Sequence, residues 1–131
     1  MEVIEINIDK EFIISTIKSV LDIDKIYVCY LFGSFGTEDF NEFSDIDIAV
    51  ITDLNFCQLG LLEGELSAKL GRDVDLVDAN KLSGIFKLQI AYRSDIVFCK
   101  DEEKLDKFLE DTDYWYKTDY RLWKAWQESE W

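Results

Sequence analysis

The residues with the most distinctive chemistry lie between positions 33 and 50, where the sequence is GSFGTEDFNEFSDIDIAV. Gly33 and Ser34 are followed, after ten further residues, by Asp45 and Asp47. A Gly-Ser turn offers backbone N–H groups and a hydroxyl to a phosphate, and the missing glycine side chain lets that phosphate come close. Alternate residues of a strand point to the same face, so Asp45 and Asp47 share a face. The segment therefore predicts a site for a phosphate and a cation.

A second pair of acids occurs in the segment DVDLVD, where Asp73 and Asp75 also share a strand face. If this strand lies beside the Asp45 strand, three carboxylates converge. Neighbouring carboxylates repel each other and stay ionised when divalent cations lie between them. Mg²⁺ fits because it takes few carboxylates and completes its shell with water and substrate phosphates. The arrangement suits phosphoryl or nucleotidyl transfer with two metal ions.

The same residues also allow a simpler interpretation, in which a tight turn precedes an edge strand whose acids only face water. Paired acids within a strand are unfavourable without a ligand, which favours the site for Asp45 and Asp47. For the third strand the simpler interpretation is stronger. Asp73 is then the strand start, and Asp78 begins a turn with Asn80.

Apolar spacing predicts the elements that position these acids. Strands are expected where β-branched and aromatic residues form short runs, and helices where apolar residues recur every three or four positions. Asp9 is the expected N-cap of the first helix, Gly71 the expected end of the second, and Gly84 a weak point in the third. The predicted order is a helix with Phe12, Ile13, Ile17, Val20 and Leu21 on its apolar face, strands at 25–32 and 45–52, a helix with Leu59, Leu62, Leu66 and Leu70, a strand at 73–78, a helix at 81–92 and a strand at 95–99.

The chain ends in a predicted helical tail, from residue 101 onward, that is rich in aromatic residues and contains all four tryptophans. One apolar stripe is expected to hold Leu105, Phe108, Leu109, Tyr116, Tyr120 and Trp123. Trp115, Leu122, Trp126 and Trp131 fall outside it and predict an interface with a partner protein or a second copy, unless the tail covers the domain's own sheet. We expect one α/β (α+β) domain over residues 1–131, with a core at about 9–100 and a tail at about 101–131.

Composition narrows the classes of function. The chain has 131 residues and a formal charge of −14, which disfavours general binding to nucleic acid and to anionic membranes. Without histidine, acid–base and metal chemistry falls to carboxylates. Cys29, Cys57 and Cys99 are widely spaced, so we expect three buried free thiols rather than disulfides or a zinc site. No apolar run is long enough to span a membrane and no signal pattern occurs, which predicts a cytoplasmic protein.

Residues 10–100 resemble the minimal nucleotidyltransferases (MNT) of the polymerase-β superfamily, on the basis of Gly33-Ser34, Asp45-Ile46-Asp47 and the strand GRDVDLVD. More narrowly, the chain is similar to MNT antitoxins that are paired with HEPN toxins. The resemblance implies a mixed β-sheet flanked by helices, ATP as donor and Mg²⁺ as cofactor. It implies that Asp45, Asp47 and Asp75 bind metal and are catalytic, and that Gly33 and Ser34 hold the triphosphate. It also implies a HEPN toxin as partner, inactivated by transfer of AMP to a tyrosine hydroxyl.

One feature departs from that family. Relatives often carry Arg or Lys shortly after Gly-Ser, whereas residues 35–39 of this chain contain no basic residue and two acids. A basic group in this loop would help to neutralise phosphate. Lys69, Arg72 and Lys87 are the candidate replacements, although each also fits a solvated surface charge.

Three functions fit these observations. The first is an active nucleotidyltransferase that modifies a protein partner. The second is an antitoxin that neutralises its partner by binding alone, which the eight aromatic residues of the tail favour. The third, ranked last, is a transferase for small cationic substrates such as aminoglycosides, because the short chain has no second domain to complete a cleft.

Overall fold

The computed structural model describes residues 10–33 and 44–129, which contain a four-stranded sheet of order β3-β2-β1-β4. β1 (Ile26–Phe32) is antiparallel to both β2 (Ile46–Thr52) and β4 (Asp95–Cys99), while β2 is parallel to β3 (Val74–Asp78). A parallel pair needs a crossover connection, which the helix α2 (Phe56–Leu70) provides. The mixed sheet predicted from the sequence is confirmed.

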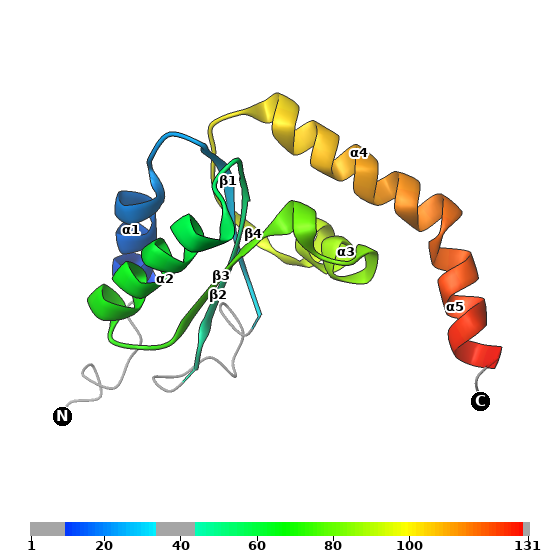
Figure 1. The fold of residues 1–131 in the computed structure, drawn as a ribbon, viewed down its shortest axis with the longest axis horizontal. Helices are drawn as coiled ribbons and strands as arrows, with labels where there is room; N and C mark the ends of the chain where they lie inside the picture. Colours follow the sequence, from blue (N-terminus) through cyan, green and yellow to red (C-terminus); the bar gives the residue numbers. More distant parts are fainter. Residues whose placement is uncertain (1–9, 34–43, 130–131) are drawn as a thin grey trace.

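Helices cover both faces of the sheet (Figure 1). α1 (Lys10–Leu21) and α2 pack on one face. α3 (Gly84–Arg93) and the first half of α4 (Glu102–Thr118) pack on the other. A short 3₁₀ turn, η2 (Ala79–Lys81), precedes α3, so the helix predicted to start at residue 81 begins three residues later.

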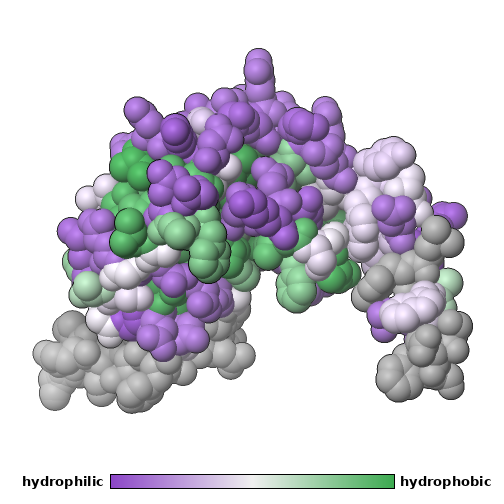
Figure 2. All heavy atoms as spheres, viewed as in Figure 1, coloured by the Kyte–Doolittle hydropathy of each residue, from purple (hydrophilic) through white to green (hydrophobic). Residues whose placement is uncertain are grey.

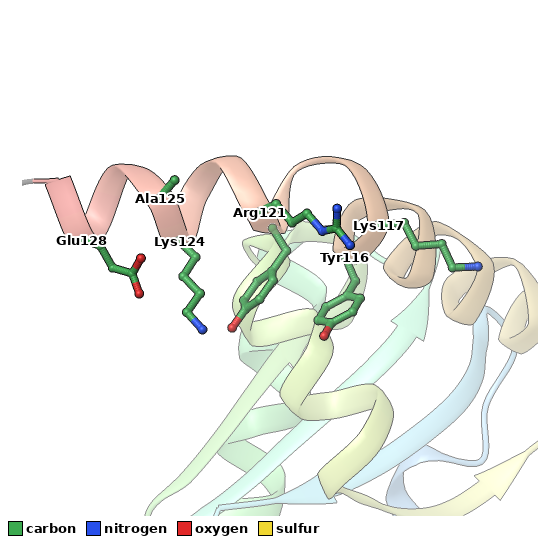
Figure 3. A pocket seen from close by; sticks show the side chains of 7 residues that line it. Tyr116, Lys117, Arg121, Lys124, Ala125 and Glu128 are labelled. Atoms are coloured by element: carbon green, nitrogen blue, oxygen red, sulfur yellow. The ribbon is translucent and has the colours of Figure 1, made fainter.

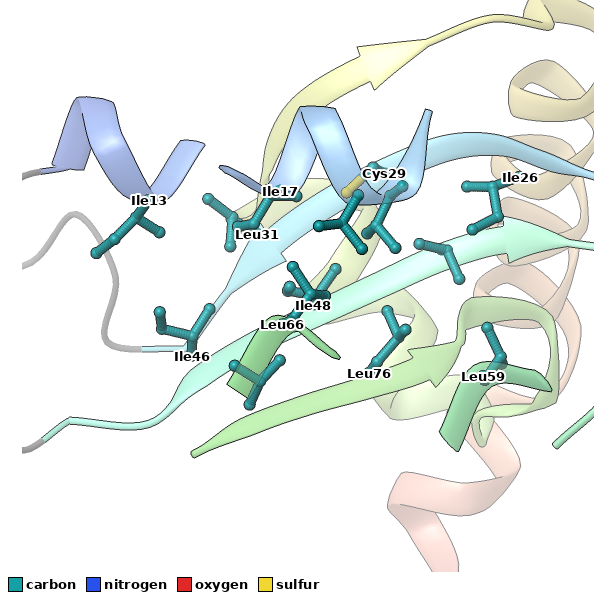
Figure 4. Packing of buried hydrophobic residues seen from close by; sticks show 14 of the residues in the cluster. Ile13, Ile17, Ile26, Cys29, Leu31, Ile46, Ile48, Leu59, Leu66 and Leu76 are labelled. Carbon is teal, nitrogen blue, oxygen red and sulfur yellow. The ribbon is translucent and has the colours of Figure 1, made fainter. Parts of the chain in front are cut away.

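The core on the α1–α2 side consists mainly of aliphatic side chains (Figure 4). The strands contribute alternate residues to it, because successive strand residues point to opposite faces of the sheet. It includes Ile13 and Ile17 of α1, Leu59 and Leu66 of α2, and Ile26, Cys29, Leu31, Ile46, Ile48, Val50, Val74 and Leu76 of the strands. Burial raises the pKa of the Cys29 thiol to about 12. All three cysteines are free, but Cys57 is exposed and Cys99 half-buried, so the expectation of three buried thiols is correct only for Cys29.

The ends of α2 are fixed by local hydrogen bonds. The Gln58 N–H donates to the Asn55 side chain at 2.8 Å, and the Asn55 N–H donates to the Gln58 side chain at 2.9 Å, which is a reciprocal capping box. Gly71 ends the helix in the left-handed conformation, with φ 68°, and its N–H donates to the Ser67 carbonyl at 2.8 Å. The predicted end at Gly71 is confirmed, and it sets the point at which the chain turns into β3.

The tail is two helices rather than one, because α4 ends at Thr118 and α5 (Tyr120–Ser129) follows after a bend. Trp115, predicted to lie outside the apolar stripe, is half-buried, and a Cβ at position 84 would overlap its indole ring. Tyr116, predicted to lie on the stripe, is instead 49% exposed. The same correction applies to Phe12 of α1, which is 51% exposed. The absence of a side chain at Gly84 therefore lets Trp115 of α4 pack closely against α3. Gly84 is the first residue of α3, so it is not a weak point within the helix.

Several expected features lie outside the described residues: the cap at Asp9, the hydroxyl of Ser34, Trp131, and the side chains of Leu122 and Trp123. Within residues 10–33 and 44–129, no helix is long and apolar enough to cross a membrane.

Candidate active site

The strand register brings the predicted acids together at one end of the sheet. Asp47 of β2 pairs with Asp75 of the parallel neighbour β3, and on its other side with Phe32 of β1. Asp45 precedes β2 by one residue and is exposed. Two positions further along the same face, Ala49 and Val77 belong to the cluster that packs against α3 and α4. The acids therefore lie on the α3–α4 face, beyond the end of its apolar core.

Asp47 is half-buried between its neighbours on the adjacent strands. Its pKa is raised from the ordinary carboxyl value, first by burial, then by the charge of Asp75 and a hydrogen bond with it, and finally by the charge of Asp45. A raised carboxyl pKa means that the ionised form is disfavoured in the folded chain. A proton or a cation between Asp47 and Asp75 relieves that cost.

Gly33 immediately follows β1 and lies against the side chain of Asp47. Its φ is 80°, a conformation that favours glycine, and a Cβ at this position would overlap the Asp47 carboxylate. Glycine here therefore meets two requirements at once, the left-handed turn and the space for Asp47. The predicted triphosphate contacts of Ser34, and the loop 35–39 that lacks a basic residue, lie outside the described residues.

The donor set can be compared with the needs of Mg²⁺. In the described part of the chain, no three metal-ligating side chains gather into a complete site. Asp47 and Asp75 nevertheless offer carboxylates on adjacent strands, and Asp45 stands on the same face. Mg²⁺ usually takes one or two protein carboxylates and fills its remaining positions with water and substrate phosphates. The donors fit Mg²⁺ that is completed by a nucleotide, rather than a metal enclosed by protein alone.

Of the three basic candidates, Arg72 lies nearest to the acids. Its Nη1 donates to the carbonyl of Ser44 at 3.0 Å, directly before Asp45, and so ties the start of β3 to the start of β2. Lys69 instead pairs with Glu65 at 3.9 Å on the exposed face of α2.

The third candidate, Lys87, lines a hollow with Tyr27 and Thr52. Tyr27 lies near the start of β1 and Thr52 ends β2, whereas Gly33 and Asp45 stand at the opposite ends of these strands. Lys87 therefore lies at the far end of the sheet from the acids.

Two other residues of the third strand segment make structural hydrogen bonds, Asp78 through its side chain and Asp73 through its backbone. The Asp78 carboxylate accepts the Asn80 N–H at 3.0 Å, so the predicted turn is confirmed. The Asp73 carbonyl accepts the Ile46 N–H at 3.0 Å, which joins the starts of β3 and β2.

Sequence reasoning missed one residue that positions the site. Glu63 of α2 accepts the Leu76 N–H of β3 at 2.9 Å, on the side of β3 that has no neighbouring strand. This bond fixes β3, and with it Asp75, against the crossover helix. Nothing in the local pattern distinguishes Glu63 from the other acids of α2, because its partner lies 13 residues away.

Comparison with known proteins identifies the family of this chain. The family model described as "Polymerase beta, Nucleotidyltransferase" matches residues 15–103, a range that includes all five predicted site residues. No curated protein matches the chain.

Solved structures of similar fold are toxin–antitoxin complexes. A chain of the MntA–HepT toxin–antitoxin shares 25% identity and a TM-score of 0.73, covering 91% of this chain and 97% of that chain. A toxin–antitoxin with AMP-PNP shares 26% identity and a TM-score of 0.75, covering 93% and 98%. The MNT antitoxin complex with the tri-AMPylated HEPN toxin of Shewanella oneidensis shares 26% identity and a TM-score of 0.76, covering 92% and 97%. These matches confirm the predicted fold class.

Proposed function

Because the chain belongs to the polymerase-β nucleotidyltransferase family, we propose that it is an antitoxin that transfers AMP from ATP to a tyrosine hydroxyl of a HEPN toxin. The observation that carries the proposal is the pairing of Asp47 with Asp75 beside Gly33, at one end of the sheet. The AMP-PNP complex and the tri-AMPylated toxin among the structural neighbours support the donor and the acceptor. Our proposal places this reaction in the cytoplasm.

Each residue has a part in the proposed reaction. Gly33 and Ser34 hold the triphosphate at the end of β1, where a larger side chain would displace Asp47. Asp45, Asp47 and Asp75 would hold Mg²⁺, which would neutralise phosphate charge and lower the pKa of the attacking hydroxyl. Asp75, exposed at its strand position, accepts the proton of that hydroxyl. The tyrosine oxygen then bonds to the α-phosphorus, and pyrophosphate leaves with the electron pair of the broken P–O bond.

The experiment uses ATP labelled at the α-phosphate and a HEPN protein, which is to be sought in the neighbouring reading frame. We expect Mg²⁺-dependent labelling of a tyrosine, lost in Asp47→Asn. Asp24→Asn is the matched control, since Asp24 is an exposed acid in the loop before β1. Absence of labelling by the unmodified protein, or full labelling by Asp47→Asn, would contradict the proposal.

A second candidate function is neutralisation by binding alone. It is favoured by large apolar side chains left exposed on the tail, where Tyr114 is 70% and Trp126 58% exposed. A growth assay separates the two functions. Protection that persists in an Asp47→Asn/Asp75→Asn variant supports binding alone, while loss of protection with retained binding supports transfer.

A further inference from the structure

The end of α4 and the whole of α5 form a projection that we call the C-terminal arm (residues 114–129). In Figure 1 the arm extends away from the sheet, and Figure 2 shows a hollow between it and the body of the molecule. Within the arm lies a groove of about 480 Å³, here called the arm groove, lined by Tyr116, Lys117, Tyr120, Arg121, Lys124, Ala125 and Glu128 (Figure 3).

Two tyrosines form the aromatic part of the arm groove. The rings of Tyr116 and Tyr120 stack with centroids 4.8 Å apart, across the bend between α4 and α5. The same two rings also line a second hollow against α3, where Tyr92 and Arg93 face them. The Tyr92 hydroxyl donates to the Asp113 carboxylate and so ties α3 to α4. The arm groove therefore continues onto the body of the protein rather than ending at a free helix.

The charge of the arm groove is opposite to that of the chain. Lys117, Arg121 and Lys124 line it with Glu128 as the single acid, although the whole chain carries −14. No ion pair within the described ranges engages the three cations. Stacked tyrosines beside unpaired cations form a surface suited to an anionic protein segment, because aromatic anchors supply contact area and the charges supply orientation.

We propose that the arm groove docks an acidic segment of the protein that accepts AMP, and this inference rests on the proposed function. The arm groove is lined by the end of α4 and by α5, and the second hollow extends it to α3. α3 and the first half of α4 cover the same face of the sheet as Asp47 and Asp75. An acidic acceptor would be repelled by that carboxylate pair unless a cationic surface on the same side held it. Nucleic acid is a poorer occupant, because its continuous run of phosphates would extend past the groove cations onto a chain of net −14, whereas a short acidic segment stays within the groove.

The test measures the affinity of the full-length protein for the same HEPN protein, by calorimetry without ATP. The variant Lys117→Gln/Arg121→Gln/Lys124→Gln removes the groove cations. The matched control, Lys18→Gln/Lys69→Gln/Lys81→Gln, removes the same charge from exposed positions elsewhere. We expect Kd to rise roughly tenfold in the groove variant alone, with a weaker dependence of Kd on salt. The KM for the acceptor should rise while kcat stays unchanged.

A second pair of variants tests the aromatic part. Tyr116→Ala removes a stacked groove residue, and Phe12→Ala removes a 51% exposed aromatic residue of α1, which packs on the other face of the sheet. We expect only Tyr116→Ala to weaken binding. The inference is overturned if groove and control variants bind alike, or if the groove cations affect only self-association in sedimentation or only binding of a single-stranded oligonucleotide. If the groove governs binding but no AMP is transferred, the proposed reaction fails and the docking surface stands.

Discussion

Replacing Gly33 by alanine perturbs the candidate site at its tightest point. The left-handed backbone at Gly33, with φ 80°, costs a residue with a Cβ roughly 1–2 kcal/mol. The new Cβ also overlaps the Asp47 carboxylate, and overpacking of this kind adds about 1–3 kcal/mol. We therefore expect Gly33→Ala to lower the free energy of unfolding by about 2–5 kcal/mol.

Gly71 offers a matched control for this substitution. It has nearly the same backbone, with φ 68°, but nothing lies within 4 Å of the position that its Cβ would take. Gly71→Ala should therefore cost only the backbone part, about 1–2 kcal/mol. Urea unfolding followed by circular dichroism measures both values, and the difference between them isolates the contact with Asp47.

A double-mutant cycle then assigns that difference to Asp47. In Gly33→Ala/Asp47→Ala the overlapping carboxylate is gone, so we expect a coupling energy of about 1–3 kcal/mol in the relieving direction. The reasoning is refuted if Gly33→Ala and Gly71→Ala cost the same, or if the cycle shows no coupling. In either case Gly33 would serve the turn alone, and the close approach of Asp47 to the end of β1 would have no energetic consequence.

Three further predictions concern the acids. Because the pKa of Asp47 is raised, the folded state binds its proton more tightly than the unfolded chain. Without Mg²⁺, stability should fall as pH rises from the ordinary carboxyl pKa through the raised one, and urea titrations at a series of pH values should show a smaller fall in Asp47→Asn, with the remainder due to Asp78, whose pKa is also raised by burial. Glu63→Ala should cost about 1–3 kcal/mol in urea unfolding by leaving a β3 amide unpaired, whereas Glu65→Ala, at an exposed position, should stay within about 0.5 kcal/mol. Asp75→Asn should abolish transfer of labelled AMP with the circular dichroism spectrum unchanged, while Asp73→Asn should retain it; the reverse result would exchange their roles.

Local patterns were sufficient to predict the sheet and its acids. The period of two along the strands placed Asp45 and Asp47 on one face. The sequence left open whether the Asp75 strand lies beside the Asp45 strand, and the pairing of β2 with β3 shows that it does. The turn from Asp78 to Asn80 was also predictable, because an Asp side chain bonds the backbone two residues on.

The tail was less predictable because its packing depends on distant residues. A single apolar stripe across residues 101–131 assigned Tyr116 inward and Trp115 outward, but within α4 the buried face runs through Phe108 and Thr112 and continues at helical spacing to Trp115. After Thr118 a separate helix begins. Trp115 is half-buried because Gly84, on another helix, leaves room for its ring. Neither the bend nor the contact follows from the spacing of apolar residues within the tail.

The bond between Glu63 and β3 also bears on how the sheet ends. Among residues 10–33 and 44–129, β3 is an edge strand, and unpaired N–H groups on an edge are a template on which other chains aggregate. The Leu76 N–H already donates to the Glu63 carboxylate, so an incoming strand would have to break this hydrogen bond. The carbonyl groups of the incoming strand would then lie beside the negative charge of Glu63. The residue that holds Asp75 in register therefore also protects this edge against the addition of strands from other molecules, which under the proposed function matters most before the chain has met its partner.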